Sequence, residues 1–189
     1  IDVLLVPVGG GGLIAGCSLV AKEMNKNIKV IGVESELYPS LSNIIYNKNK
    51  ICKGSTLAEG IAVSEIGEIP LSIIKDYVDD VITVSDTSIE RAISMLAEHE
   101  KVVAEGAGAV GLAAILENQE IFKGKKVGVI LCGGNIDSKV LSSILMRDLV
   151  RSGQVTTLTI TMPDKPGQLQ IISKILSLIH ISEPTRRSA

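Results

Sequence analysis

Short apolar runs alternate with amphipathic segments along most of this chain. The apolar runs have the length and composition of strands in a parallel sheet, and they lie at 3–6, 28–34, 78–84 and 127–131. The amphipathic segments predict helices at 13–24, 39–45, 88–98, 106–117 and 138–151. A strand, a turn, a helix and a second strand in this order form a βαβ unit, whose strands are parallel. The pattern therefore predicts the α/β class, with an open parallel sheet and helices on both faces.

The pattern changes after Gly153, where we place a domain boundary. Residues 1–153 form the α/β domain, whose last helix ends at a C-cap formed by Ser152 and Gly153. Residues 155–162 alternate between apolar and polar side chains, as a half-exposed strand does. A turn at 163–167 and a helix over 168–176 follow, so residues 154–176 are interpreted as the start of a second, α+β domain. Residues 177–189 are similar to translated sequencing-adapter sequence, and we interpret them as a non-native tail.

Four consecutive glycines, Gly9 to Gly12, separate the first predicted strand from the first predicted helix. Glycine contributes no side-chain packing and costs backbone entropy, so an ordinary turn seldom uses so many. Without side chains, several backbone N–H groups can approach an anion closely at the start of a helix. We interpret Gly9, Gly10, Gly11 and Gly12 as a phosphate cradle; a plain strand–helix turn is the alternative.

A second glycine turn, Cys132-Gly133-Gly134-Asn135, follows the last predicted strand. Ligands of open parallel sheets bind at the carboxyl ends of the strands, so both turns should face one crevice, with Gly133 in its wall. We expect Cys132 to make a weak polar contact with a ligand there, the alternative being a small buried hydrophobe. Glu105, at a helix start, either lines the crevice or stabilises the helix dipole. Gly60 lies in the irregular segment 56–63, where we expect it to allow an unusual backbone angle.

Composition narrows the function classes. Hydrophobic residues make up 46% of the 189 residues and charged ones 21%, which is enough for a folded core. A net charge of -2 and 2% aromatic residues do not indicate a nucleic-acid or membrane partner. No apolar run reaches the roughly 18 residues of a membrane span. Cys17, Cys52 and Cys132 are far apart and form no CxxC pair, so neither a disulfide framework nor a zinc site is predicted, and a reducing cytoplasm is expected.

A dinucleotide site is the main alternative for the first glycine run. A strand, a glycine turn and Glu34 some 22 residues beyond Gly12 imitate the Rossmann fingerprint, in which an acid binds the ribose. The spacing does not give G-x-G-x-x-G, because Ile14 or Ala15 stands where the last glycine belongs. An alanine is sometimes accepted there, so an NAD-binding oxidoreductase domain stays open.

Five motifs in sequence order resemble the threonine ammonia-lyases (threonine dehydratases), which belong to the fold-type II pyridoxal-phosphate enzymes. They cover about residues 1–152. The motifs are VPVGGGGL at 6–13, IGVE at 31–34, LAEGIAV at 57–63, VAEGAGA at 103–109 and LCGGNID at 131–137. Residues 157–176, with DKPGQL at 164–169, resemble the opening strand, turn and helix of an ACT regulatory domain.

The resemblance implies roles for several residues. Gly9–Gly12, closed by Leu13, would bind the phosphate of pyridoxal 5'-phosphate through backbone N–H groups, and Cys132 stands where the family usually has a serine facing the pyridine nitrogen. Related enzymes bind a divalent cation on an acid matching Glu34 and on a second acid; Ser40 stands in the second place, so no metal is expected. The Schiff-base lysine of the family lies in a Ser-x-Lys motif that this chain lacks, and Lys22 and Lys26 are expected at exposed helix positions. We therefore expect an N-terminal truncation, no catalytic residue in this fragment, and an inactive fragment.

For the complete enzyme the resemblance implies β-elimination of L-threonine, and of L-serine as a second candidate, to 2-oxobutanoate or pyruvate plus ammonia. The context would be isoleucine biosynthesis or threonine catabolism in the cytoplasm. The ACT-like segment implies an amino-acid effector, and a homo-oligomer is expected. The alternatives are a serine racemase or serine dehydratase of the same fold, the NAD-binding domain above, and a non-catalytic amino-acid-binding module.

Overall fold

The computed structural model describes residues 1–178 and divides into two compact units. The first unit is 1–148 and the second begins at Leu149. We describe each unit by itself. Within the described residues, no helix is both long enough and apolar enough to cross a membrane.

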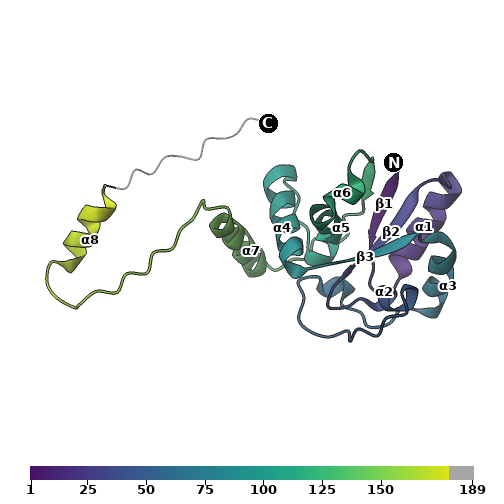
Figure 1. Cartoon of the computed structure of the whole chain (residues 1–189), viewed down its shortest axis with the longest axis horizontal. Helices are drawn as coiled ribbons and strands as arrows, with labels where there is room; N and C mark the ends of the chain where they lie inside the picture. Colours follow the sequence, from purple (N-terminus) through teal and green to yellow (C-terminus); the bar gives the residue numbers. More distant parts are fainter. Residues whose placement is uncertain (179–189) are drawn as a thin grey trace. The chain divides into compact units, whose positions relative to one another are not determined.

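The first unit contains a four-stranded parallel sheet with the order β3-β2-β1-β4 (Figure 1). The strands are β1 (Val3–Pro7), β2 (Lys29–Ser35), β3 (Asp80–Val84) and β4 (Val127–Val129). In the centre of the sheet Leu5 pairs with Ile31 on one side and with Val129 on the other. The strand order and direction confirm the predicted α/β class with an open parallel sheet.

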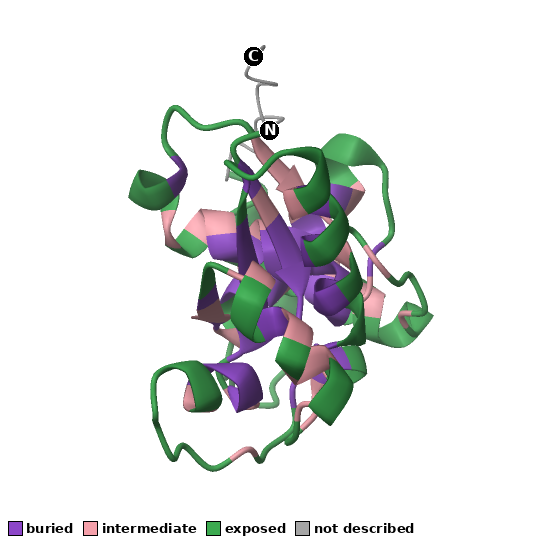
Figure 2. Cartoon of the chain, turned by 90° about the vertical axis from the view of Figure 1, so that its right-hand side faces the viewer, coloured by how far each residue is buried: buried purple, intermediate pink, exposed green. Residues whose placement is uncertain are grey.

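Helices cover both faces of the sheet and enclose two separate cores. Helices α1 (Gly12–Met24) and α3 (Glu68–Tyr77) pack together on one face, and α4 (Asp86–Met95) and α5 (Gly106–Glu117) on the other. Side chains alternate along β1, so that Val3 and Leu5 join the core under α5 while Val6 joins the core under α1. Figure 2 shows the resulting buried layer at the centre of the sheet. The remaining elements of this unit are α2 (Ser40–Ile45), η1 (Glu59–Ile61), η2 (Leu96–Glu100), α6 (Gln119–Phe122) and α7 (Ser138–Arg151), the last of which runs into the second unit.

The first unit differs from the sequence prediction in several places. The helix predicted over 88–98 begins at Asp86 and ends at Met95, where η2 follows. Strand β4 has three residues, is half-buried rather than buried, and Leu131 beyond it is 45% exposed, because β4 is an edge of the described sheet. Helix α3 lies in a segment for which no helix was predicted, and Pro70 lies within it. Pro70 is the third residue of the helix, where its missing N–H group would have no partner in any case, and so it does not break the helix.

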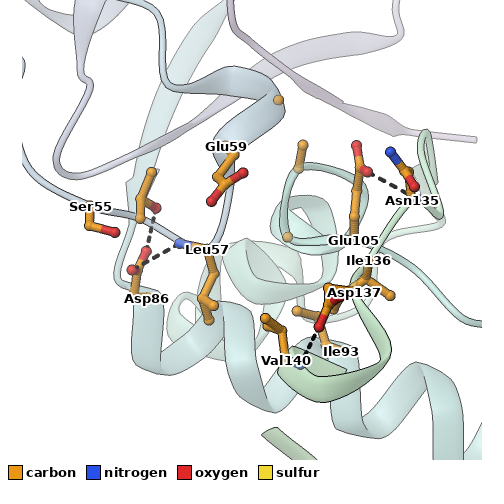
Figure 3. Close-up of a pocket in the computed structure, with 14 residues that line it drawn as sticks. Ser55, Leu57, Glu59, Asp86, Ile93, Glu105, Asn135, Ile136, Asp137 and Val140 are labelled. Atoms are coloured by element: carbon orange, nitrogen blue, oxygen red, sulfur yellow. Dashed lines mark hydrogen bonds between the residues drawn. The ribbon is translucent and has the colours of Figure 1, made fainter. Parts of the chain in front are cut away.

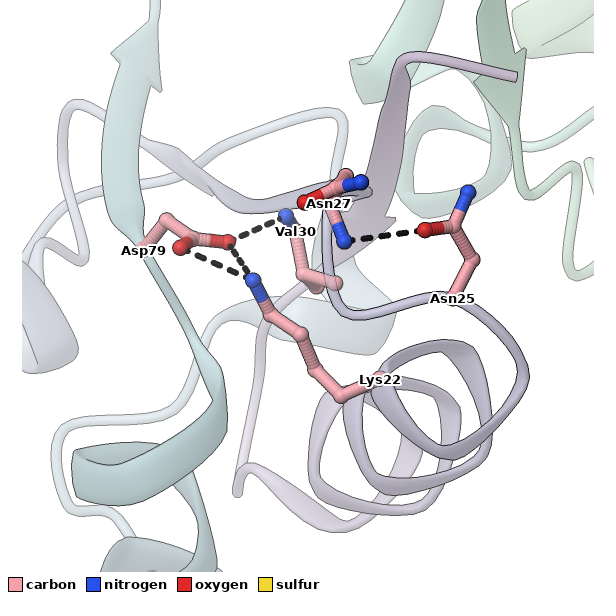
Figure 4. A network of polar contacts seen from close by, with 5 residues as sticks. All are labelled: Lys22, Asn25, Asn27, Val30 and Asp79. Carbon is pink, nitrogen blue, oxygen red and sulfur yellow. Dashed lines mark hydrogen bonds and ion pairs between the residues drawn. The ribbon is translucent and has the colours of Figure 1, made fainter.

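An ion pair joins the C-terminal end of α1 to the start of β3 (Figure 4). Lys22 Nζ lies 2.9 and 2.7 Å from the two carboxylate oxygens of Asp79, and the same carboxylate accepts a hydrogen bond from the Val30 N–H at 2.7 Å. The prediction that Lys22 is a plain exposed helix position is therefore wrong, because its side chain is only 17% exposed. Lys26 is exposed, as predicted, but it lies in the turn that follows α1 and not in a helix.

The second unit contains α8 (Gln168–Leu176), whose bounds match the predicted helix. The strand predicted over 155–162 is wrong, since these residues form no strand. A strand forms hydrogen bonds only with a neighbouring strand, and none of the described residues supplies one to this segment. Of the predicted non-native tail, 177 and 178 are described, and 179–189 lie outside the described residues.

Candidate functional site

The candidate site lies where the strand order of the sheet reverses. The chain runs from β1 to β2 and β3 on one side, whereas β4 lies on the other side of β1. Ligands of open α/β sheets bind in the crevice that such a reversal leaves at the carboxyl ends of the two strands. Here the first glycine run follows β1 and the second glycine turn follows β4, and both line one pocket of about 310 Å³, which we call the glycine pocket.

The glycine pocket brings together all of the predicted site residues except Glu34. Its lining includes the four glycines of the predicted phosphate cradle, Leu13 and Cys132, and the predicted crevice residues Gly60, Glu105 and Gly133. The residues that sequence reasoning missed are Pro7, Ile61 and Ala107. Ile61 and Ala107 are direct neighbours of a motif glycine, and Pro7 lies two residues before Gly9, so closeness to the motif glycines is the signal that would have found them.

The first glycine run forms one wall, and the conformation of its glycines explains their number. Gly11 has a φ of 88° and precedes α1 as its N-cap. A Cβ atom at Gly9 would lie 3.2 Å from Ile61 Cα, so this glycine allows another segment to approach closely, whereas Gly10 and Gly12 face open space. Gly60 has no positive φ, so the predicted unusual backbone angle is wrong there. Its lack of a side chain instead makes room for Ala107 and Glu105, which a Cβ atom would meet at 3.2 and 3.3 Å.

The start of α1 is suited to an anion. Among the described residues no side chain caps it, and its first turn contains no acidic residue, so its free N–H groups and the positive end of the helix dipole face the pocket. Gly10 and Gly12 leave the backbone accessible on that side. These features fit the phosphate of a cofactor, and the interpretation of the glycine run as a phosphate cradle stays a prediction.

The opposite wall is built on the first turn of α5. A Cβ atom at Gly106 would lie 2.1 Å from the Leu57 carbonyl oxygen, and one at Gly108 would lie 2.5 Å from the Cys132 carbonyl oxygen. The two glycines thus allow two loops to press against α5 from different sides. The motif VAEGAGA therefore fixes the distance between the loop at 57–60 and the turn at 132–135.

Cys132 lines the glycine pocket with a half-buried side chain. Burial raises the pKa of its thiol, and the negative charge of Glu105 raises this pKa further. The thiol is therefore protonated at neutral pH, so it can donate a weak hydrogen bond but is not an activated nucleophile. The weak polar contact of Cys132 with a ligand stays a prediction.

A second pocket of about 420 Å³ adjoins the glycine pocket and shares Gly60, Glu105 and Ala107 with it. We call it the side pocket (Figure 3). On one side Asp86 accepts hydrogen bonds from the Thr56 hydroxyl and the Leu57 N–H, and on the other Glu105 accepts one from the Asn135 N–H. These carboxylates hold the loops that border both pockets.

Glu34 has a different role from the two considered for it. Its buried carboxylate accepts hydrogen bonds from the Ser40 hydroxyl and from the N–H groups of Leu41 and Ser42 at 2.7–3.0 Å, and so it caps the start of α2. Burial raises its pKa, and these hydrogen bonds act in the opposite direction. The prediction that Glu34 contacts a ribose in a dinucleotide site is wrong, because its carboxylate is fully buried under α2 and does not line the glycine pocket.

No group of three or more His, Cys, Asp or Glu side chains within residues 1–178 could hold a metal ion.

The chain is similar to known proteins of one enzyme family. Residues 1–133 match the family described as "Pyridoxal-phosphate dependent enzyme". The chain is 42% identical over 179 residues to an L-threonine ammonia-lyase of Thermotoga maritima, a match that covers 94% of this chain and 44% of the relative. An L-threonine ammonia-lyase of Geobacter sulfurreducens is 41% identical over 169 residues, covering 88% of this chain and 42% of the relative. The chain thus spans less than half the length of these curated relatives.

The fold is also similar to those of solved structures of threonine deaminase and serine racemase. The processed form of threonine deaminase isoform 2 from Solanum lycopersicum is similar with a TM-score of 0.71 at 30% identity, over 77% of this chain and 44% of that one. A serine racemase from Dictyostelium discoideum is similar with a TM-score of 0.65 at 35% identity, over 72% of this chain and 45% of that one.

Proposed function

Because the chain belongs to the family of pyridoxal-phosphate dependent enzymes, we propose that it is part of an ammonia-lyase that acts on L-threonine. The observation that carries the proposal is the meeting of both glycine turns in one pocket beside an uncapped helix start. The named lyases among its relatives support the reaction and the substrate.

In this proposal the described residues bind and orient the cofactor. The N–H groups of Gly9–Leu13 hold its phosphate, and the Cys132 thiol donates a hydrogen bond to its ring nitrogen. When bound, pyridoxal phosphate supplies the electron sink that allows an amino acid to lose its α-proton and its β-hydroxyl group. A thiol that keeps its proton is a neutral donor, so it orients the ring without adding a charge beside it.

We propose that the lysine that attaches the cofactor is not among the residues of the glycine pocket. No lysine lines the glycine pocket among residues 1–178. We therefore infer that the complete enzyme supplies this lysine and that the chain alone binds the cofactor without catalysing the reaction. Residues 154–176 as the start of an ACT domain, an amino-acid effector, a homo-oligomer and a cytoplasmic location belong to the same proposal.

A serine racemase or serine dehydratase is the second candidate, and it is favoured by the structural similarity to a serine racemase. The two candidates share the glycine pocket and differ in their products. The complete enzyme, supplied with the cofactor and L-threonine, should release 2-oxobutanoate and ammonia. D-serine formed from L-serine, with no 2-oxobutanoate formed from L-threonine, would contradict the lyase assignment.

Cofactor binding by this chain can be tested directly. We expect pyridoxal phosphate to bind and pyridoxal, which lacks the phosphate, to bind more weakly, because the cradle faces the phosphate. Equal binding of the two compounds, or saturable binding of NADH in their place, would contradict the proposed site.

A further inference from the structure

Glu105 contacts the second glycine turn at two points. Its carboxylate oxygen Oε2 accepts a hydrogen bond from the Asn135 N–H at 3.1 Å, and its own N–H donates to the Gly133 carbonyl oxygen at 3.2 Å. One residue at the start of α5 thus holds both ends of the turn. The first of these hydrogen bonds is to an ionised acceptor, a class about twice as strong as a neutral pair.

The turn and the carboxylate also fit each other in shape. Gly133 has a φ of 91°, which residues with side chains seldom adopt. A Cβ atom at Gly133 would lie 2.3 Å from Glu105 Oε1, so the carboxylate lies directly against the glycine backbone. Gly133, Gly134 and Asn135 are exposed, so burial contributes little to holding them in place.

Cys132 immediately precedes this turn, and its carbonyl oxygen lies against α5 at Gly108. The direction of its side chain therefore depends on the backbone angles that Glu105 holds. We propose that Glu105 is a positioning residue whose carboxylate fixes the 133–135 turn and thereby directs Cys132 into the glycine pocket. The inference rests on the proposed function only for the identity of the ligand.

Thiol labelling of the cofactor-free chain tests this inference. We would measure the rate at which a maleimide labels each of the three cysteines in the chain, resolved by peptide mass spectrometry, as a function of pH. Glu105→Gln keeps an oxygen that can accept from Asn135 but removes the charge. Glu105→Ala removes both. Glu59→Ala is the matched control, since Glu59 lines the side pocket and is exposed.

The two Glu105 variants should differ in a defined way. In Glu105→Gln, labelling of Cys132 should move to lower pH, and the limiting rate at high pH should rise much less than in Glu105→Ala, because a weaker hydrogen bond to Asn135 remains. In Glu105→Ala the limiting rate should rise as well, by up to about tenfold, because the turn loses a hydrogen bond to a charged group. Cys17 and Cys52 should label as in the unmodified chain, and Glu59→Ala should change none of the three rates.

Three results would overturn the inference. They are an unchanged limiting rate for Cys132 in Glu105→Ala, an equal rise in Glu105→Gln, and a parallel rise at Cys17 and Cys52, which would indicate general loosening of the fold. None of these results depends on cofactor binding. If the unmodified chain failed to bind pyridoxal phosphate, the proposed function would fail while the labelling rates would still decide the role of Glu105.

Discussion

Replacement of Gly106 by alanine tests whether the first turn of α5 sets the width of the glycine pocket. The added Cβ atom would lie 2.1 Å from the Leu57 carbonyl oxygen and 2.4 Å from its carbonyl carbon. Both are backbone atoms, so no side-chain rotation relieves the overlap. Ordinary contact begins at about 3.4 Å, so the loop at 57–58 or the helix must shift by roughly 1 Å.

The expected cost follows from two opposing effects. Gly106 is the first residue of α5, so the preference for alanine inside a helix, about 1 kcal/mol, applies to it only in part, whereas overpacking of a tight contact costs about 1–3 kcal/mol. We therefore expect Gly106→Ala to lower the free energy of unfolding by about 1–2 kcal/mol. It should also weaken binding of pyridoxal phosphate, because the wall that contains Gly60 moves.

The assay is urea unfolding followed by circular dichroism, with cofactor titration on the same samples. Gly16→Ala is the matched control, since Gly16 lies in α1, is exposed, and has no atom within 4 Å of its Cβ position. That variant should gain up to about 1 kcal/mol. If Gly106→Ala proved as stable as Gly16→Ala and bound the cofactor normally, the proposed clamping of α5 would be refuted.

Three further changes have definite expected outcomes in urea unfolding. Ser94→Ala should leave stability unchanged or raise it by about 1 kcal/mol, since the buried Ser94 hydroxyl has no hydrogen-bond partner among the described residues; a loss of more than about 1 kcal/mol would contradict this. Asp79→Ala should cost about 2 kcal/mol because it removes an ion pair and a backbone hydrogen bond, while Lys123→Ala, at an exposed pair 3.9 Å apart, should cost almost nothing. Burial raises the pKa of Glu117, but hydrogen bonds from serine hydroxyl and N–H groups outweigh it, and the net pKa lies below its ordinary value of 4.5. The ionised form is thus favoured by folding, so Glu117→Gln should be destabilising at neutral pH, and the difference from the unmodified chain should shrink as the pH falls below 4.5; a constant difference would refute this.

The sequence was sufficient for the elements whose signals are local. Helix α5 begins and ends where the small-residue run predicts, and Ser85 caps α4 by accepting a hydrogen bond from the Ser88 N–H. The convergence of the two glycine turns was also predictable, because it requires only parallel strands and the rule for their carboxyl ends.

The features that were missed depend on contacts between segments far apart in sequence or on missing neighbours. The role of Glu34 depends on the start of α2, which has Pro39 as its N-cap and no cap of its own, so the buried carboxylate supplies one. The packing of Gly60 depends on Glu105 and Ala107, which the sequence separates from it by more than forty residues. Lys22 reaches Asp79 across a similar separation. The strand predicted over 155–162 has a strand-like sequence but no neighbour among the described residues.

Because β4 is short, the second glycine turn should separate from the first more easily than the whole domain unfolds. Gly12 and Cys132 are separated by 120 residues of sequence. The segment that leads into the second glycine turn is joined to β1 by three paired residues, by the hydrogen bond from the Ile130 N–H to Leu5, and by those from the Asp2 and Val3 N–H groups to the Lys126 carbonyl oxygen. A short edge segment can detach at a lower free energy than the whole domain unfolds. A ligand that contacts both walls binds only the closed form, so binding would slow the exchange of the Ile130 amide hydrogen more than that of amides in β2. Ligand binding would then stabilise the closed form of the glycine pocket.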